Sequence, residues 1–464
     1  MRAAAAAPAS TELRPAREMS GELAVPADKS IAHRALILGA LAEGRSTIVV
    51  RHPGEDVLST LAALRALGVR AEAAGDEPTT GHEPTSGEPL PPTSVRIDGL
   101  GQAGHAGRLG GGQADCGNSG TTMRLLMGAL AGGAGEVVLT GDASLSRRPM
   151  ERVAEPLRRM GAEVATTDGR PPVTILGRRP LAGVNHELSV ASAQVLGALV
   201  LAALAADGRT AITVPGPTRD HTERMLSAMG VPLSRSGRPR GASVTTVDGP
   251  SVPRPMRMTV PGDFSSAAAW VVAAAIHPAA SVRLANVGLN PTRVALLDAL
   301  REMGAGIEAT VETEQAGEPI GTISVSSRGG PLRALRVGPE LVPALIDELP
   351  LLAVAMAAAE GTSEVRGAQE LRVKESDRIA AVAAALTAVG ANVEELPDGW
   401  RIRRGRPREA TIATRGDHRL AISLAVAAWA GVAAGVRLDD PACVAVSYPT
   451  FWRDAQRLGL GGPA

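Results

Sequence analysis

The sequence predicts an α/β protein built from six repeated units, and three observations carry this prediction. An amphipathic helix that ends in Leu-x-x-x-Gly, or in a terminal variant of that pattern, occurs six times, with its glycine at Gly68, Gly161, Gly230, Gly304, Gly390 and Gly459. Six Ala-rich, nearly all-apolar helices alternate with these helices, and a helix that is apolar all round is buried. Most of the apolar helices lead within a few residues into a β-rich stretch.

Each unit is expected to run in the order strand, buried helix, strand, surface helix over about 70 to 90 residues. In chain order, the buried helices are predicted within 31–44, 122–135, 193–208, 265–276, 349–361 and 418–435. The β-rich stretches that follow them include 46–50, 136–141, 210–214, 281–287 and 363–367. The glycines that end the surface helices are expected to adopt a left-handed conformation, which glycine alone enters without steric cost.

Two segments fall outside this pattern. Residues 76–93 are rich in Pro, Gly and Thr and lack apolar periodicity, so we expect a disordered surface insertion within the first repeat. The beginning of the chain has only five consecutive alanines before Pro8, which is too short an apolar run for a secretory signal. We therefore expect a loose tail there.

The composition excludes several function classes. Lys plus Arg equals Asp plus Glu at 48 each, and only 2% of residues are aromatic, so we expect no nucleic-acid partner. The two cysteines, Cys116 and Cys443, lie far apart in the sequence, which indicates a reducing compartment and a cytoplasmic protein. No apolar stretch reaches the roughly 18 residues that a membrane span needs, so we expect no membrane association.

Cap-type or charged residues come directly before each predicted buried helix. These clusters are 28–30, 118–121, 192–194, 263–266, 347–348 and 417–419. Each of them taken alone is an ordinary helix N-cap. If the six helix starts converge on one cleft, however, their amide groups and partial positive charges predict a site for a small, multiply anionic substrate.

The chain contains two lysines, Lys29 and Lys374, and 46 arginines. Their retention could be accidental in an Arg-biased sequence. Lysine is a compact charge whose pKa burial can tune, whereas arginine is a fixed, permanently charged fork. A site that moves protons cannot exchange one for the other.

Eleven stretches together resemble the EPSP synthase family of enolpyruvyl transferases. They are DKSIAHRAL, GNSGTTMRLL, GDASLSRRPM, ASAQV, TRDHTE, PGDFSSAAAW, NPTR, IDELPLLAVA, LRVKESDR, GDHRLA and SYPTFW. The resemblance covers essentially residues 20–455. It implies transfer of the enolpyruvyl group of phosphoenolpyruvate to the 5-hydroxyl of shikimate 3-phosphate, with release of phosphate, in aromatic amino-acid biosynthesis.

The resemblance also implies a two-lobed enolpyruvyl-transferase-like fold with three repeats per lobe. Residues 1–27 are then the tail and the first strand of the C-terminal lobe, 28–261 the N-terminal lobe and 262–464 the rest of the C-terminal lobe. A monomer is expected.

Site residues follow from the resemblance position by position. It implies that Lys29, Arg148, Arg378, Arg419 and the backbone at Gly120 bind phosphoenolpyruvate. It implies that Ser30 and Arg34 hold the shikimate carboxylate, that Ser192 binds the 3-phosphate and that Gln194 lines the join between the substrates. Asp347 would accept the 5-hydroxyl proton, and Lys374 with Glu375 would move a proton at the methylene carbon. No metal or cofactor is expected, because Arg and Lys supply the charge stabilisation.

Other residues of these motifs are expected to be structural. Asp263 and Ser265 are expected to cap a helix, Arg293 to support the fold or the site from behind, and Cys116 to be a buried thiol. The chain departs from many family members at Ala193, where they have Ser, and at Val446, where they have Lys. Two alternatives remain open: an enolpyruvyl transferase acting on UDP-N-acetylglucosamine, and a non-catalytic phosphosugar-binding relative.

Overall fold

The computed structural model describes residues 12–73, 93–101, 111–133, 135–177, 180–237 and 241–462. These residues form two compact units. The C-terminal unit comprises 12–26, 262–312 and 320–462, and the N-terminal unit comprises 27–261 and 313–319. The predicted lobe boundaries at 27/28 and 261/262 stay predictions. The tail at 1–11 and residues 76–92 of the expected insertion lie outside the described residues, and Thr93 begins a strand.

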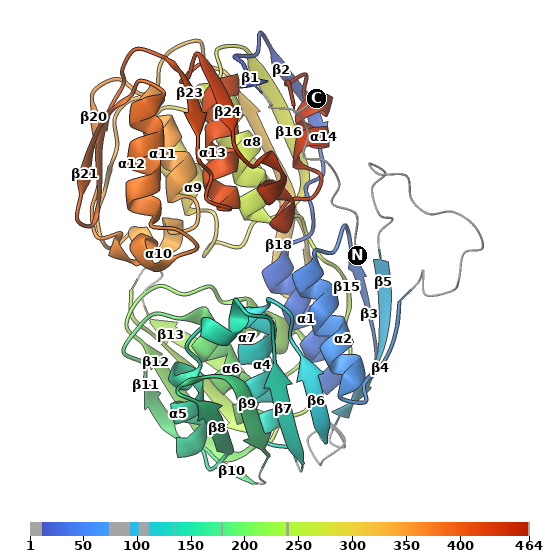
Figure 1. The fold of residues 1–464 in the computed structure, drawn as a ribbon. Coiled ribbons are helices and arrows are strands. Elements are labelled where there is room, and N and C mark those ends of the chain that lie inside the picture. Colours follow the sequence, from blue (N-terminus) through green and yellow to red (C-terminus); the bar gives the residue numbers. More distant parts are fainter. Residues whose placement is uncertain are drawn as a thin grey trace, which may run out of the picture. The chain divides into compact units, whose positions relative to one another are not determined.

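The described residues of the N-terminal unit form three sheets, with helices between their strands (Figure 1). Its helices are α1 (Lys29–Leu41), α2 (Glu55–Ala66), α4 (Gly120–Ala131), α5 (Glu151–Arg159), α6 (Ala193–Ala203) and α7 (His221–Ala228), with a 3-10 turn at Leu145–Arg147. Its strands are β3 (Glu43–Val50), β4 (Arg70–Ala73), β5 (Thr93–Leu100), β6 (Gly112–Asp115), β7 (Glu136–Thr140), β8 (Glu163–Thr167), β9 (Arg170–Leu176), β10 (Leu181–Ala182), β11 (Asn185–Glu187), β12 (Ala206–Val214), β13 (Leu233–Gly237), β14 (Ser243–Gly249) and β15 (Arg257–Thr259).

The C-terminal unit repeats this plan. Its helices are α8 (Phe264–Ile276), α9 (Ala295–Glu302), α10 (Val342–Leu345), α11 (Leu349–Ala358), α12 (Arg378–Ala388), α13 (His418–Trp429) and α14 (Phe451–Arg457), with 3-10 turns at Gln369–Val373 and Pro441–Val446. Its strands are β1 (Glu12–Leu13), β2 (Met19–Leu23), β16 (Ala280–Gly288), β17 (Gly306–Gln315), β18 (Glu318–Ser326), β19 (Arg336–Val337), β20 (Thr362–Val365), β21 (Asn392–Leu396), β22 (Gly399–Arg403), β23 (Glu409–Ile412) and β24 (Gly435–Leu438). The turn between β17 and β18 falls within 313–319, which group with the N-terminal unit.

One strand order recurs in the sheets. In the sheet β6-β7-β9-β8, the strands before and after a buried helix pair in parallel, and the strands after the surface helix complete the sheet in antiparallel fashion. The order β19-β20-β22-β21 repeats this plan, with α11 between its two parallel strands. The orders β15-β3-β5-β4 and β2-β16-β18-β17 have the same pattern of parallel and antiparallel pairs, but their first strands, β15 and β2, come from distant parts of the chain. A short connection cannot join parallel neighbours, so α4 and α11 serve as the crossovers of β6-β7 and β19-β20. The predicted α/β class and its repeated unit are confirmed.

The six repeat glycines have the backbone conformation that the sequence predicts. Gly68, Gly161, Gly230, Gly304, Gly390 and Gly459 have φ angles of 86, 96, 84, 102, 102 and 79°. Each of these glycines follows the end of a surface helix. Glycine is favoured there because an amino acid with a Cβ atom is strained at a positive φ angle.

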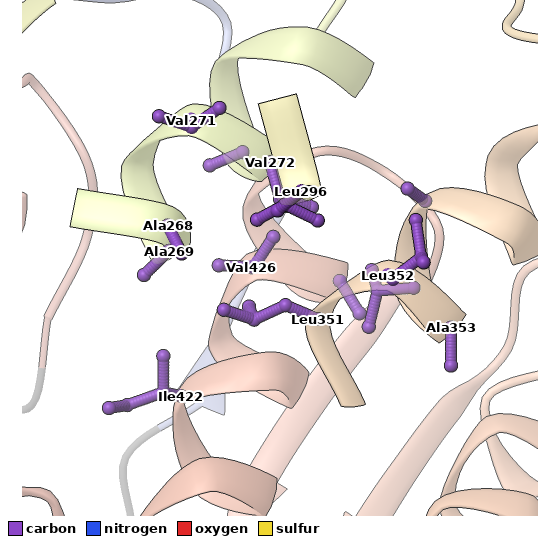
Figure 2. Packing of buried hydrophobic residues seen from close by; sticks show 14 of the residues in the cluster. Ala268, Ala269, Val271, Val272, Leu296, Leu351, Leu352, Ala353, Ile422 and Val426 are labelled. Carbon is purple, nitrogen blue, oxygen red and sulfur yellow. The ribbon is translucent and has the colours of Figure 1, made fainter. Parts of the chain in front are cut away.

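The six apolar helices form the centres of the two units. In the C-terminal unit, α8, α11 and α13 pack together through small and branched side chains, among them Ala268, Leu352 and Val426 (Figure 2). Alanine lets the helix backbones approach one another. The buried rings of Trp270 on α8 and Trp429 on α13 stack with their centroids 5.9 Å apart and fill the remaining space. In five of the six helices a side chain of the predicted cap cluster accepts a hydrogen bond from the first turn, at Asp28, Ser119, Ser192, Asp263 and Asp417.

The sixth cap differs from the expectation. Glu348 precedes α11, but its side chain makes no capping hydrogen bond. Pro350 is the second residue of this helix and has no amide hydrogen, so the first turn has one donor fewer to satisfy. The Glu348 carboxylate instead accepts a hydrogen bond from the Ser265 hydroxyl at 2.5 Å.

A buried histidine on β11 predicts an acid-sensitive unfolding equilibrium. Both ring nitrogens of His186 lack a hydrogen-bond partner among the described residues. Burial, together with the nearby Arg159 cation, lowers the pKa of His186 to about 4. The unfolded chain takes up this proton near pH 6.5, so the folded state loses stability as the pH falls from 6.5 to 4.

We expect His186→Leu to flatten this dependence by up to about 1.4 kcal/mol per pH unit. The measurement is urea unfolding of both proteins at pH 8, 6 and 5. The pH 8 comparison is the control, because the histidine is then neutral in both states. Equal slopes below pH 6 in the two proteins would show that His186 is not responsible.

Candidate active site

The start of α1 carries three of the predicted substrate-binding residues. The Nζ atom of Lys29 lies 3.5 Å from Oδ2 of Asp56, and both side chains are partly exposed. Arg34 is buried and donates from Nε to the Thr222 hydroxyl at 2.8 Å and from Nη1 to the Ser30 carbonyl at 2.9 Å. Burial lowers the pKa of Arg34. The structure thus brings Ser30 and Arg34 together and fixes the guanidinium against α7.

The loop before α4 forms a hydrogen bond with a second predicted cation, Arg148. Nη2 of Arg148 donates to Oδ1 of Asn118 at 2.6 Å, and Nδ2 of Asn118 donates to Asp142 at 2.9 Å. A Cβ atom on Gly120 would lie 2.9 Å from Nη1 of Arg124 and 3.2 Å from Nη1 of Arg148. Glycine therefore allows two guanidinium groups to approach the first turn of α4, where helix amides favour an anion.

Gln194 is held at the same helix start. Its Oε1 accepts a hydrogen bond from Nη1 of Arg124 at 2.5 Å, and its Nε2 donates to the Thr121 hydroxyl at 3.0 Å. Ser192, two residues earlier, caps α6 through the amide of Val195. The structure therefore brings together Gly120, Arg148 and Gln194 within the N-terminal unit.

Arg124 also belongs to this group, although it was not among the residues predicted from the sequence. Its side chain is largely buried, and burial, with smaller effects from Arg152 and Arg148, lowers its pKa to about 10. The available signal was the single charge within the otherwise apolar run of α4. A buried charge of this kind needs a partner, which Gln194 and the Pro149 carbonyl supply.

In the C-terminal unit, Asp347 lies between two arginines. Arg419 donates from Nη1 to the Asp347 carbonyl at 2.5 Å, and its Nη2 lies 3.8 Å from the carboxylate. Nη1 of Arg293 lies 3.9 Å from the other carboxylate oxygen. Burial lowers the pKa of Arg419, but the neighbouring carboxylates, Asp347 first, outweigh burial and raise it overall. Asp347 and Arg419, both predicted from the sequence, are in contact.

Arg293 ties this carboxylate to the start of α8. It is buried and donates from Nη2 to Ser265 at 2.8 Å and to Asp263 at 3.2 Å. Asp263 caps α8 by accepting from the Ser265 amide, as expected from the sequence. The sequence marked the buried Glu348 only as a helix cap, whereas its carboxylate shares the Ser265 hydroxyl with Arg293.

Lys374 and Glu375 are neighbours in the sequence but have different partners. Nζ of Lys374 lies 2.7 Å from Oε1 of Glu370, one helical turn earlier in a 3-10 segment. Oε2 of Glu375 lies 2.6 Å from Nη2 of Arg378. Burial raises the pKa of Glu375, but the Arg378 charge and the other favourable contacts outweigh burial and lower it overall.

Asp417 links two of the predicted phosphoenolpyruvate-binding arginines. Its fully buried carboxylate accepts hydrogen bonds from Nε and Nη2 of Arg378 at 2.9 and 3.2 Å. The same carboxylate accepts from the Ser376 hydroxyl at 2.8 Å and from the Arg419 amide at 3.0 Å. The sequence marked Asp417 only as a helix cap.

Three other positions were singled out from the sequence. Cys116 is fully buried, so the expected buried thiol is confirmed. Burial, with a smaller effect of Asp115, raises the pKa of this thiol to about 12. Ala193 is the first residue of α6. The Val446 side chain is 69% exposed, so no buried contact explains its presence there.

The described part of the chain holds no group of three or more His, Cys, Asp or Glu side chains that could bind a metal ion. Nor does it contain a helix with both the length and the hydropathy that crossing a membrane requires. The expectations of no metal and no cofactor stay predictions.

The two units are built from α/β repeats, and basic side chains lie at or near several helix starts, among them Lys29 at α1, Arg148 beside α4 and Arg419 at α13. This arrangement is typical of proteins that bind small anions. The family model for EPSP synthase (3-phosphoshikimate 1-carboxyvinyltransferase) matches residues 13–455. The chain therefore belongs to the EPSP synthase family, which confirms the resemblance seen in its sequence.

Relatives match along the whole chain. A 3-phosphoshikimate 1-carboxyvinyltransferase of Synechococcus sp. (strain WH7803) is 47% identical and aligns with 97% of this chain and 99% of its own length. One from Acidithiobacillus ferrooxidans (strain ATCC 53993 / BNL-5-31) is 46% identical, with 97% of each chain covered. The solved EPSP synthase of Acinetobacter baumannii has a TM-score of 0.82 at 39% identity and covers 97% of this chain and 98% of its own.

Proposed function

We propose that this protein transfers the enolpyruvyl group of phosphoenolpyruvate to the 5-hydroxyl of shikimate 3-phosphate. The products are 5-enolpyruvylshikimate 3-phosphate and inorganic phosphate, and the reaction serves aromatic amino-acid biosynthesis. One observation carries the proposal: relatives named for this activity are 46 to 47% identical over at least 96% of the chain. The helix starts rich in Arg and Lys support it, because both substrates are anions.

The N-terminal unit is proposed to supply most of the binding groups. Ser30 and Arg34 bind the shikimate carboxylate, Ser192 binds the 3-phosphate and Gln194 lies where the two substrates meet. Lys29, Gly120 and Arg148 bind phosphoenolpyruvate. Arg148 suits this role because Asn118 already orients its guanidinium, so less side-chain entropy is lost on binding.

The C-terminal unit is proposed to supply the proton transfers and two more cations. In the transfer, a bond forms between the 5-oxygen and C2 of the enolpyruvyl group, and the bond from C2 to the phosphate oxygen breaks. Asp347 takes the hydroxyl proton, and Arg419 beside it stabilises the negative charge of the substrates. Lys374 and Glu375 transfer the proton that the methylene carbon first gains and then loses. Arg378 and Arg419 complete the phosphoenolpyruvate contacts.

Two alternatives are the transfer of enolpyruvate to UDP-N-acetylglucosamine and the binding of phosphosugars without catalysis. A phosphate-release assay with phosphoenolpyruvate and each acceptor in turn separates them. We expect release with shikimate 3-phosphate alone. We expect its loss in Asp347→Asn, a variant that keeps the side-chain size. Release with only the nucleotide sugar, or from neither acceptor by folded protein, would overturn the proposal.

A monomer in the cytoplasm is also proposed, because the two cysteines are unpaired and buried and the family's substrates are small metabolites. Light scattering of the purified protein tests the first part, with the mass of a single chain as the expected result. Fractionation of the producing cells tests the second.

A further inference from the structure

A chain of buried polar side chains joins three helices of the N-terminal unit. Nδ1 of His33 on α1 lies 2.6 Å from Oγ1 of Thr60 on α2. Oγ1 of Thr60 lies 2.6 Å from Oγ1 of Thr122 on α4, which lies 2.7 Å from Oγ of Ser119. None of the four residues is more than 2% exposed. The chain therefore ends at the residue that caps α4, directly before Gly120.

The hydrogen bonds of this chain have a direction. Nε2 of His33 is buried and has no partner in the part of the chain that the structure describes. A buried N–H without an acceptor is rarer in proteins than a buried acceptor without a donor, so the proton belongs on Nδ1. His33 then donates to Thr60, and Thr122 donates to Ser119. The Thr60 hydroxyl has two acceptors within reach, Thr122 at 2.6 Å and the Asp56 carbonyl at 3.3 Å, and it donates to Thr122 because that contact is the shorter and the Thr122 proton is already used.

His33 keeps this role at neutral pH. Burial, with smaller effects from Lys29 and Arg34, lowers the pKa of His33 to about 3, so the ring stays neutral with one N–H. Ser119 also accepts a hydrogen bond from the Thr122 amide at 3.2 Å. Both acceptor positions of its oxygen are thus used within the first turn of α4, and the cap is held in one rotamer.

We propose that His33 is a positioning residue, which acts through Thr60 and Thr122 to fix the first turn of α4 for phosphoenolpyruvate. This inference rests on the proposed function, in which Gly120 contacts that substrate. An anion bound at a helix start depends on the exact direction of a few amide groups, so a small rotation of the turn weakens binding. Burying four polar side chains is less favourable than burying apolar ones. Their hydrogen bonds lead to the cap of α4, which is consistent with a role in holding that helix start.

Thr60→Val tests the proposal, because it removes the central hydroxyl and keeps the side-chain volume. We expect the KM for phosphoenolpyruvate to rise about tenfold while kcat and the KM for shikimate 3-phosphate change less than twofold, because the lost binding is common to the ground state and the transition state. Thr60→Ser keeps the hydroxyl and is expected to restore most of the affinity. Thr210→Val is the matched control, since the Thr210 hydroxyl is buried without a partner on the described residues.

A second readout does not depend on activity. Amide hydrogen exchange across 120–124 is expected to speed up in Thr60→Val but not in Thr60→Ser or Thr210→Val. If Thr60→Val does not fold, His33→Leu and His33→Asn replace it, because asparagine can present an N–H near the position of Nδ1.

These experiments test the proposed function and the positioning role of His33 separately. A wild-type protein that releases no phosphate overturns the proposed function, and the exchange of 120–124 still decides whether the chain of hydroxyls holds α4. A Thr60→Val protein with unchanged exchange in α4, or with both KM values raised equally, would overturn the positioning role of His33.

Discussion

Lys374→Arg is expected to lower turnover by a hundredfold or more, which corresponds to about 3 kcal/mol of transition-state stabilisation. Arginine serves nearly every other basic position of the chain, with 46 residues against two lysines. Nζ of Lys374 lies 2.7 Å from Oε1 of Glu370, and the Lys374 side chain is partly buried. A guanidinium is bulkier and stays protonated, so it cannot give a proton to carbon and take it back.

The comparison variant is Lys29→Arg. In the proposed function Lys29 supplies charge, so this variant is expected to raise the KM for phosphoenolpyruvate with a smaller effect on kcat. Steady-state kinetics and thermal unfolding of both variants make the test, and the melting temperature of Lys374→Arg is expected to stay near that of the wild type. A Lys374→Arg enzyme within a few fold of wild-type turnover would mean that the proton transfer lies elsewhere.

Asp417→Asn is expected to destabilise the protein by about 3 kcal/mol, the lower end of the range for a broken buried ion pair. The substitution leaves the buried guanidinium of Arg378 without its fully buried counter-charge. Glu375 still pairs with Arg378, but its side chain is 55% exposed, so solvent screens that contact. Urea unfolding measures the loss.

Asp248→Asn is the matched control. Asp248 accepts two hydrogen bonds from Arg209, as Asp417 does from Arg378, but both partners lie on the surface. We expect no measurable loss of stability from this variant. Equal losses in the two variants would show that burial of the Arg378–Asp417 pair is unimportant.

The same pair predicts a dependence on acid. Burial raises the pKa of Asp417, but the hydrogen bonds and charge of Arg378 outweigh burial and lower it overall. The unfolded carboxyl has a pKa of about 3.9, so the pair's contribution is complete above that pH and is lost as the pH falls through the lower, folded value.

The repeat pattern was predictable because each of its elements depends on residues that are close together in the sequence. A helix end with Leu-x-x-x-Gly needs only its own residues, and the positive φ of Gly68 or Gly390 follows from them. An apolar helix such as α11 likewise shows its burial in its composition. These elements require no knowledge of what packs against them.

The polar contacts were less predictable because they depend on side chains far apart in the sequence. Arg124 meets Gln194 across 70 positions, and Thr60 meets Thr122 across 62. Residues that are adjacent in the sequence can also have different partners: Lys374 pairs with Glu370, whereas Glu375 pairs with Arg378. Predicting such pairs requires the rotation of each helix about its axis, which composition does not give.

The way the sheets are closed sets an order for folding during synthesis. β15 completes the last sheet of the N-terminal unit, so all three of its sheets have their strands once residue 259 has left the ribosome. In the C-terminal unit, β2 pairs with β16 and β1 pairs with β24, so these two early strands wait until residues 280–288 and 435–438 have been made. During that wait they are unpaired edges, and their shortness and their glutamates, Glu12 and Glu22, protect the nascent chain against aggregation.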